Sequence, residues 1–329
     1  MASKNSALLC MLQILYKYSD DEHYLLQEDI IRIMKEEYNI TCERKSIGEY
    51  TKQLEELGFN VIKEPRKGIH IDKILYPSEV YFLMDQVIAN KTIDETQTNR
   101  LNDQLSNLLS KYEKEERKIE NAISKSIRNK SKSNALLFTI SQIRIAIKKK
   151  KKISLKYENP TLNKDFKREE FVVNPKFLIS TQGRNYLVCY YDNKDTLYNY
   201  KLEYIKKVSI LETAITPYET ISKDGLDISL EQYTEEHIYP LSGETVDATI
   251  KLINESAYAP LVDWYGYKTK VEKHEDGYYY ADVKVNENSL VIWALQFGDI
   301  VEVISPESTI AKINKKIDNL ASIYSNKKE

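Results

Sequence analysis

A tyrosine-rich run of strand-forming residues at the centre of the chain constrains the fold more than any other feature. It spans residues 174–208 and has the sequence NPKFLISTQGRNYLVCYYDNKDTLYNYKLEYIKKV. Aromatic and β-branched side chains favour strands, and Gly183 marks a turn. Just upstream, Ile153, Leu155 and Tyr157 alternate with polar residues, as in a strand with one buried face. The centre of the chain is therefore predicted to form a compact β unit.

The size and composition of the chain indicate a soluble, multidomain protein. Its 329 residues are enough for two or three domains, and 42% apolar with 30% charged residues is typical of globular proteins. No apolar run approaches the ~18 residues that a bilayer-spanning helix needs, and the N-terminus lacks the order of a signal peptide. We therefore expect a cytoplasmic protein without a membrane partner. The three cysteines, Cys10, Cys42 and Cys189, predict neither a disulfide framework nor a thiolate metal site.

Charge is distributed unevenly along the chain, although the net charge is only −2. Residues 117–168 contain 16 basic and 3 acidic side chains, whereas residues 215–329 contain 11 basic and 20 acidic ones. A basic segment of this strength attracts polyanions. We therefore predict a polyanionic partner for the middle of the chain.

The first 75 residues show the pattern of three helices followed by a hairpin. Apolar residues recur at helical spacing three times, and Thr41 and Gly58 can cap the start and the end of the third helix. Two short apolar runs then flank a polar tip, as strands flank a turn. The predicted segments are helices in 8–15, 27–38 and 41–58 and strands in 61–63 and 68–71.

This order of elements is that of a winged helix-turn-helix, in which the third helix enters the major groove and the hairpin, or wing, touches phosphates. The span ITCERKSIGEYTKQLEELGF also resembles the recognition helix of DeoR-like bacterial repressors, with Ser46, Leu54, Leu57 and Gly58 at the matching positions. A winged helix used only for protein contact is the alternative. The residues predicted to contact DNA are Arg44, Lys45, Ser46, Glu49 and Lys52 on the helix and Arg66 and Lys67 on the wing.

Residues 76–132 are predicted to form a helical connection between domains. Pro77 followed by Ser78 and Glu79 is typical of a helix start, and apolar residues recur at helical spacing in two runs. The leucines of this region are expected to serve the core or a dimer contact.

The central segment carries several motifs in a fixed order. They are Ala146-Ile147, Ile153-Ser154-Leu155-Lys156-Tyr157, Arg168, Pro175, Gly183-Arg184-Asn185-Tyr186-Leu187 and Tyr200-Lys201-Leu202-Glu203-Tyr204-Ile205. In this order they resemble the WYL domain, although Asn185 stands where the family has its tryptophan. The resemblance implies an SH3-like, Sm-type small β-barrel at residues 133–214 and a basic groove that senses nucleic acid or a nucleotide-like effector.

The predicted effector site combines tyrosines with basic residues. Such a combination can stack bases and neutralise a phosphate, and it tolerates any single-stranded sequence. The alternative is that alternating tyrosines simply pack as sheet formers. The residues predicted to bind the effector are Tyr157, Arg168, Tyr186, Tyr198, Tyr200 and Lys201.

The last third of the chain is predicted to contain an acidic linker, residues 215–243, and a unit with β-α-β-β-α-β order, residues 244–329. The end of this unit, with Trp293, Gly298-Asp299 and Pro306, resembles the WCX extension that follows WYL domains. The resemblance implies a homodimer and a unit suited to protein contact.

These segments predict an α+β multidomain fold: a winged helix, a helical linker, a small β-barrel and a C-terminal α+β unit. His23, His70, His237 and His274 lie in unrelated contexts, and no nucleophile or phosphate-loop motif is present, so we expect neither catalysis nor a cofactor. The predicted function is a bacterial transcriptional regulator. Its winged helix binds double-stranded operator DNA, and an effector in the WYL groove controls that binding. The alternative is an accessory protein that binds single-stranded RNA or DNA for a partner nuclease or defence system.

Overall fold

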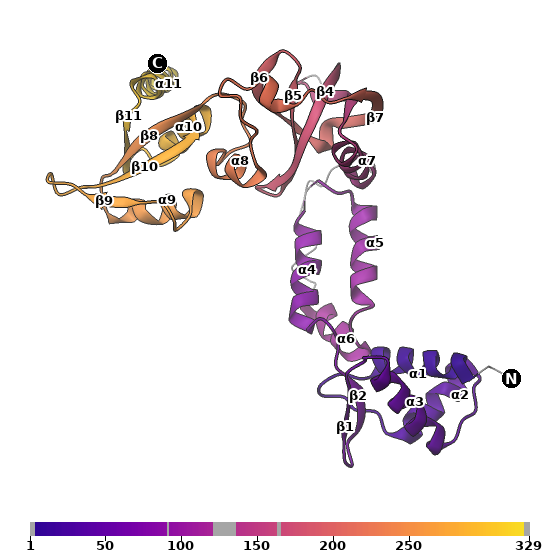
Figure 1. Cartoon of the computed structure of the whole chain (residues 1–329). Coiled ribbons are helices and arrows are strands. Elements are labelled where there is room, and N and C mark those ends of the chain that lie inside the picture. Colours follow the sequence, from indigo (N-terminus) through magenta and orange to yellow (C-terminus); the bar gives the residue numbers. More distant parts are fainter. Residues whose placement is uncertain (1–3, 91, 121–135, 163–165, 326–329) are drawn as a thin grey trace. The chain divides into compact units, whose positions relative to one another are not determined.

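The computed structural model describes residues 4–90, 92–120, 136–162 and 166–325 (Figure 1). The chain divides into two compact units, residues 1–134 and 135–329. Helices dominate the first unit, and the two larger sheets lie in the second. The fold is a mixture of α and β structure with a helical N-terminal part, which agrees with the predicted class at this level.

The first unit begins with three helices and a hairpin, in the predicted order. These elements are α1 (Lys4–Tyr18), α2 (Gln27–Tyr38), α3 (Arg44–Glu56), β1 (Val61–Glu64) and β2 (Gly68–Ile71). The predicted cap at Thr41 is wrong, because Glu43 takes the extended N-cap conformation and α3 starts at Arg44. Gly58 has a φ of 90° just after the helix end, as predicted for a left-handed cap.

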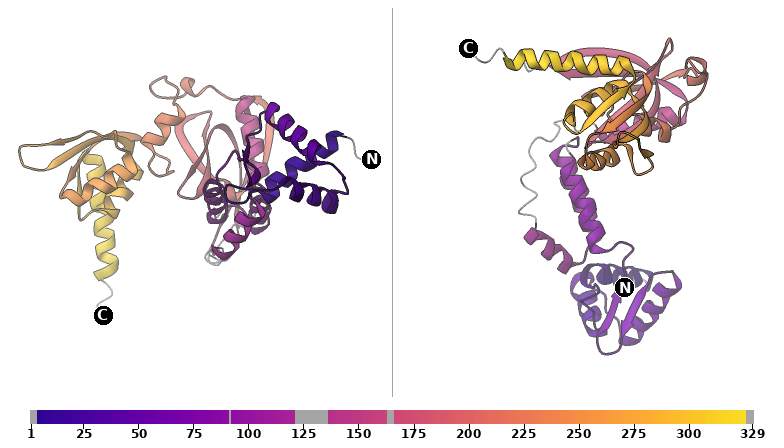
Figure 2. Two further views of the ribbon diagram at one scale, coloured as in Figure 1. Left: turned by 90° about the horizontal axis from the view of Figure 1, so that it is seen from below. Right: turned by 90° about the vertical axis from the view of Figure 1, so that its left-hand side faces the viewer.

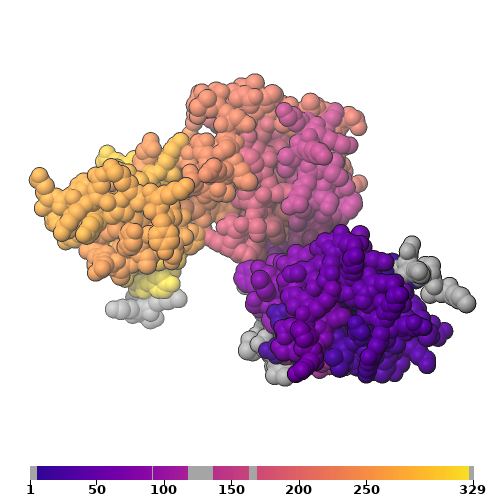
Figure 3. All heavy atoms as spheres, turned by 60° about the horizontal axis from the view of Figure 1, so that its bottom comes forward, coloured from indigo at the N-terminus to yellow at the C-terminus, as the bar shows by residue number. Residues whose placement is uncertain are grey.

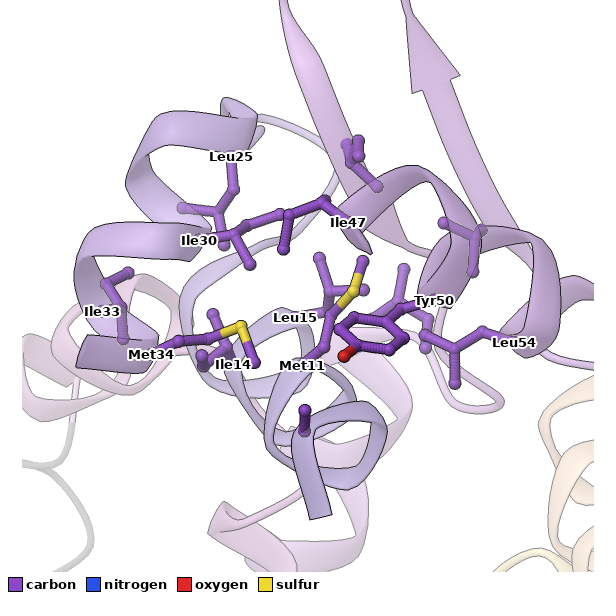
Figure 4. Packing of buried hydrophobic residues seen from close by; sticks show 14 of the residues in the cluster. Met11, Ile14, Leu15, Leu25, Ile30, Ile33, Met34, Ile47, Tyr50 and Leu54 are labelled. Atoms are coloured by element: carbon purple, nitrogen blue, oxygen red, sulfur yellow. The ribbon is translucent and has the colours of Figure 1, made fainter. Parts of the chain in front are cut away.

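The three helices pack around one apolar core (Figure 4). α2 buries Ile30, Ile33 and Met34, at the spacing of one helix face. α3 buries Ile47 and Leu54 against the same core. Burial of one such side chain contributes about 1.5–3 kcal/mol. The buried face of α3 thereby fixes which of its residues face outward.

A backbone contact holds the hairpin against the loop before α2. Leu25 and Ile69 exchange two hydrogen bonds, with N···O distances of 2.9 and 2.8 Å. Gly68 has a φ of 125°, and a Cβ at this position would collide with the carbonyl group of Leu25. Only glycine fits there, because both its backbone conformation and the close approach exclude a side chain. The hairpin is thus fixed relative to the start of α2.

Three further helices complete the first unit: α4 (Pro77–Ala89), α5 (Glu95–Ser106) and α6 (Lys111–Glu120). α4 and α5 lie side by side (Figure 1). The Ser110 hydroxyl, just before α6, donates to Asp20 over 2.6 Å, and Lys73 pairs with Glu113 at 2.7 Å. The segment predicted to be a helical connection is helical in α4, α5 and α6 up to Glu120, and the boundary predicted at residues 132–133 lies outside the described residues.

The second unit starts with α7 (Leu136–Lys148) and a five-stranded antiparallel sheet in the order β6-β5-β4-β3-β7. The strands are β3 (Lys151–Pro160), β4 (Phe166–Thr181), β5 (Arg184–Tyr191), β6 (Lys194–Lys201) and β7 (Ile205–Ala214). The alternation predicted for residues 153–157 is confirmed, because Ile153, Leu155 and Tyr157 are all buried. α7 packs against β3, β4 and β7.

A short helix lies inside the segment predicted to be an acidic linker. This helix, α8 (Leu230–Glu236), places Tyr233 in a fully buried position. Tyr233 packs with Val188, Tyr190 and Leu197 of the five-stranded sheet. The segment therefore contributes to the core of the second unit.

The rest of the second unit confirms the predicted β-α-β-β-α-β order. Its elements are β8 (Thr245–Leu252), α9 (Tyr258–Tyr265), β9 (Val271–Lys273), β10 (Tyr279–Asn286), α10 (Glu287–Gln296), β11 (Val301–Ser305) and α11 (Glu307–Ser325). The strands form a sheet in the order β11-β8-β10-β9, and Trp293 is fully buried in its core. Figure 2 shows α11 extending beyond this sheet, which leaves Ile317 and Leu320 half exposed. None of the helices in the described part of the chain has the length and apolar character required to cross a lipid bilayer.

Candidate nucleic-acid interfaces

The outward face of α3 carries four of the five residues predicted for this helix. Arg44, Lys45, Glu49 and Lys52 are exposed, whereas Ser46 is half-buried. The core residues of α3 recur at three- and four-residue intervals, which leaves the opposite face free of core contacts (Figure 4). The helix therefore brings the four exposed side chains together on one surface.

The other two predicted residues lie at the tip of the β1–β2 hairpin. Arg66 and Lys67 are exposed, and Figure 3 shows the first unit from the side of this tip. Arg66 and Arg44 line the same hollow between the hairpin and the starts of α2 and α3, together with Lys63. Lys63 was not predicted, because the direction of a strand side chain is known only once the strand pairing is known.

Carboxylates pair with several of the cations of this surface. The pairs are Arg44 with Glu28, Lys63 with Glu55 at 2.7 Å, and Lys67 with Glu64 at 2.6 Å. Lys67 and the Tyr24 hydroxyl, which both donate to Glu64, hold the pKa of that carboxyl below its usual value. The surface thus alternates in charge, and a phosphate has to compete with these carboxylates for the cations.

A glycine lies in the middle of the exposed face of α3. Gly48 follows Arg44 by one turn and precedes Lys52 by one turn. A Cβ at Gly48 would have no heavy atom within 4 Å among the described neighbours, and the backbone there is helical. Glycine inside a helix costs about 0.5–1 kcal/mol relative to alanine. Neither packing nor backbone conformation in the described chain requires it.

Aromatic side chains form a cluster in the second unit. The half-buried Tyr200 of β6 lies 5.0 Å from Tyr157 of β3 and 5.1 Å from Phe171 of β4, measured between ring centroids. Tyr204 lies 6.0 Å from Tyr157. These edge-on and tilted contacts are typical of packed aromatic rings. The structure thus brings together the predicted Tyr157 and Tyr200 and adds Phe171 and Tyr204.

Two of the predicted tyrosines are enclosed. Tyr157 and Tyr186 are each only 6% exposed. The backbone N–H of Lys201 donates to the Tyr157 hydroxyl over 3.2 Å, and burial raises the pKa of Tyr157 to about 12. Tyr157 is therefore a protonated part of the packed interior at neutral pH. A role of these two rings in effector binding stays a prediction.

The more accessible rings lie at the end of β5, on β6 and in the turn after β6. Tyr198 and Lys201 are half-buried. The Lys194 amine lies 5.6 Å from the Tyr198 ring centroid and 5.7 Å from that of Tyr191, and the Lys201 amine lies 5.6 Å from that of Tyr204. Rings with amines beside them suit the stacking of a base next to its phosphate. We call Tyr191, Lys194, Tyr198, Lys201 and Tyr204 the β6 surface.

Arg168, the remaining predicted effector residue, lies on β4 opposite Glu158 of β3. Its side chain is outside the described residues. Lys194 was not predicted, because its place beside Tyr191 follows from the pairing of β6 with β5 and not from local pattern. Tyr204, in the turn after β6, was not predicted as an effector residue either.

A separate cavity of about 370 Å³ lies beside α8. Its two lysines pair with carboxylates of the same lining, Lys223 with Glu244 at 2.6 Å and Lys284 with Glu236 at 3.0 Å. An acidic lining repels a polyanion. The cavity is therefore a poorer candidate for a nucleotide than the β6 surface. The acidic residues of the lining are Asp195, Asp224, Asp227, Glu236 and Glu244.

Comparison with known families concerns the segment that holds α7 and the five-stranded sheet. Residues 139–210 match the family model of the WYL domain. The match confirms the predicted resemblance of the central segment, which we call the WYL region. No curated protein matches the chain significantly.

The solved structures that are similar to the chain include two at low identity. Proteasome accessory factor B/C (PafBC) of Arthrobacter aurescens is 17% identical over 96% of this chain, with a TM-score of 0.30. The chain spans about half of that protein's length, 48%. A CRISPR Cas-related protein is 14% identical over 99% of this chain and 85% of its own length, with a TM-score of 0.37.

Proposed function

We propose that this protein is a DNA-binding transcriptional regulator. Its first unit acts as a winged helix-turn-helix on duplex operator DNA, and its WYL region senses a nucleic-acid or nucleotide-like effector that controls operator binding. It acts in the cytoplasm as a homodimer and carries out no catalysis. The observation that carries the proposal is the exposed face of α3, with Arg44 and Lys45, next to a hairpin that ends in Arg66 and Lys67.

The geometry of the first unit supports duplex binding. The major groove is about 12 Å wide and admits one α-helix. With α3 in the groove, Lys45 and Lys52 reach base edges or phosphates, and Arg66 and Lys67 reach the flanking backbone. Binding is expected to weaken with salt, because phosphate contacts release counterions from the DNA. The carboxylates that pair with Arg44 and Lys67 have to be displaced, which lowers affinity most at low salt, where these ion pairs are strongest.

The β6 surface supports the effector part of the proposal. Tyr198 has the Lys194 amine beside it and Tyr204 has the Lys201 amine beside it, so each ring offers a face for a base and an amine for that base's phosphate. An effector changes operator affinity only if it binds two conformations of the protein differently. The expected effect on DNA is therefore reciprocal: operator DNA changes effector affinity by the same factor.

Duplex selection tests the proposal. Full-length protein is used to select duplexes from a random pool, and binding of the selected duplex is titrated at several salt concentrations. Replacing Arg44 and Lys45 by alanine is expected to weaken binding at least ~10-fold and to lower the salt slope by about two. The matched control is Arg32→Ala with Lys35→Ala, which removes two exposed cations from α2. Duplex binding that survives the α3 change intact contradicts the proposal.

The second candidate function is an accessory protein that holds single-stranded nucleic acid for a partner nuclease or defence system. The pairing of amines with tyrosine rings on the β6 surface favours it, because such sites bind single strands without sequence preference. Tight binding of a single-stranded oligonucleotide, with no duplex selected, would support this alternative.

A further inference from the structure

We infer that Gly48 is the point at which the backbone of α3 comes closest to bound DNA, and that a side chain at this position is excluded by the duplex. The inference rests on the proposed function of the first unit and adds a residue that determines specificity.

The usual structural reasons for a glycine in a helix are absent at Gly48. It is the fifth of the 13 residues of α3, so it is not a cap. It has no positive φ, in contrast to Gly58 and Gly68. Apart from its chain neighbours and the backbone of α3 itself, a Cβ would meet none of the described atoms within 4 Å, so no other element in the first unit approaches too closely. A glycine that weakens its helix without an internal reason indicates the close approach of a partner's surface.

The surroundings of Gly48 fit nucleic acid as that partner. Arg44 and Lys52 lie one turn before and one turn after it, and both are exposed. The helix rises 1.5 Å per residue, so these two cations are about 12 Å apart along the axis with bare backbone between them. A strand of DNA that crosses the helix there can touch the backbone while its phosphates meet the two cations. The hollow lined by Arg44 and Arg66 continues this surface toward the hairpin.

A size series at Gly48 separates contact from helix stability. Full-length Gly48→Ala and Gly48→Leu are compared with the wild type in two measurements: amide hydrogen exchange of residues 44–56 and affinity for a duplex that the wild type has selected from a random pool. Alanine and leucine are both strong helix formers, so exchange is expected to slow in both variants. Affinity is expected to fall about tenfold with alanine, the size of one lost base-edge contact, and further with leucine.

Gln53→Ala is the matched control, because Gln53 is exposed on α3 but lies outside the proposed contact residues. Its duplex affinity is expected to equal that of the wild type. If both Gly48 variants bind the selected duplex like the wild type, the inference is wrong while the proposed function stands. If Gly48→Ala and Gly48→Leu lose the same amount of duplex affinity, the loss comes from the reduced flexibility of α3 and not from the size of the side chain. That result would also overturn the inference. Failure of the wild type to select any duplex would overturn the proposed function and this inference together.

Discussion

The imidazole ring of His23 lies flat against the phenol ring of Tyr112, with centroids 3.7 Å apart and planes 7° from parallel. His23 precedes α2, and Tyr112 is on α6, so the stack joins the helix bundle to the end of the helical connection. Beside it, Asp20 accepts hydrogen bonds from the Ser110 hydroxyl at 2.6 Å and from the backbone N–H of His23 at 2.8 Å. Burial raises the pKa of Asp20, but these hydrogen bonds lower it more, so the carboxylate stays charged.

Ser110→Ala is expected to destabilise the first unit by about 1–3 kcal/mol, because the largely buried Asp20 carboxylate loses the hydrogen bond that the Ser110 hydroxyl donates to it. The measurement is urea unfolding of the full chain followed by circular dichroism, with amide exchange of α6 as a local readout. Ser106→Ala is the matched control, since its hydroxyl donates to the Asp103 carbonyl at the surface. Its expected effect is within about 0.5 kcal/mol. Equal effects of the two serine changes would contradict the role given to the Asp20 contact.

Truncating Tyr157 is expected to lower mainly the free energy of unfolding, and truncating Tyr198 mainly the affinity for single-stranded oligonucleotides. Tyr157→Ala removes a buried ring and is expected to cost about 3–5 kcal/mol of unfolding free energy. Tyr198→Ala is expected to cost only about 1 kcal/mol, because the ring is half-buried. Binding of a fluorescein-labelled oligothymidine is expected to weaken by about 1–3 kcal/mol with Tyr198→Ala. Tyr157→Phe should leave that binding unchanged and lose only the hydrogen bond from Lys201.

Glu28→Gln and Glu64→Gln are expected to raise duplex affinity, because each change frees a cation, Arg44 or Lys67, for a phosphate. An exposed ion pair is worth at most about 1 kcal/mol, so the gain should be about two- to fivefold and shrink at high salt. Glu36→Gln is the control: it makes the same change of net charge but removes one of the two carboxylate partners of Arg32 on α2, the other being Asp29. If Glu36→Gln raises affinity as much, only net charge matters and the two pairs have no specific role.

Asp192 is expected to make the second unit less stable in acid. Its carboxylate accepts hydrogen bonds from Lys152 at 2.6 Å, Thr216 at 2.8 Å and Asn174 at 2.9 Å, which lower its pKa from 3.8 to about 2. A depressed carboxyl pKa stabilises the fold above pH 4, and this contribution is lost as the pH falls from about 4 to 2. Asp192 is half exposed, so the contribution is about 0.5–1 kcal/mol.

Asp192→Asn should therefore lower the urea midpoint at pH 7 and have little effect at the acid end of this range. The control is Asp195→Asn, whose ion pair with Lys223 is long, at 3.7 Å. An effect of Asp192→Asn that is the same at both ends of the range would contradict the assigned pKa.

The local pattern of apolar and polar residues was enough to predict the helix α3 and the strand β3, which carry residues of the two candidate interfaces. The alternation of Ile153, Leu155 and Tyr157 and the helical repeat of α3 depend on neighbouring residues, so they are visible in sequence. The exposed positions of Arg44, Lys45 and Lys52 follow from that repeat. The ion pair of Arg44 with Glu28 does not, because it depends on how α2 and α3 cross.

The remaining features of the two candidate interfaces depend on contacts between residues that are far apart in the sequence. Tyr186 and Tyr198 have the same chemistry, and sequence cannot tell which ring is covered until strand register and neighbouring elements are known. Tyr233 lies in a seven-residue helix within an acidic stretch, too short for a clear apolar repeat, yet it is fully buried against the five-stranded sheet. Its burial is a tertiary effect.

The bridge between Leu25 and Ile69, with no room for a side chain at Gly68, ties the hairpin to the start of α2. If the first unit binds DNA as proposed, the protein, and not the target, sets the interval between the base pairs that contact α3 and the phosphates that contact the hairpin. A target lengthened by one base pair within that interval would keep one of the two contacts and lose the other.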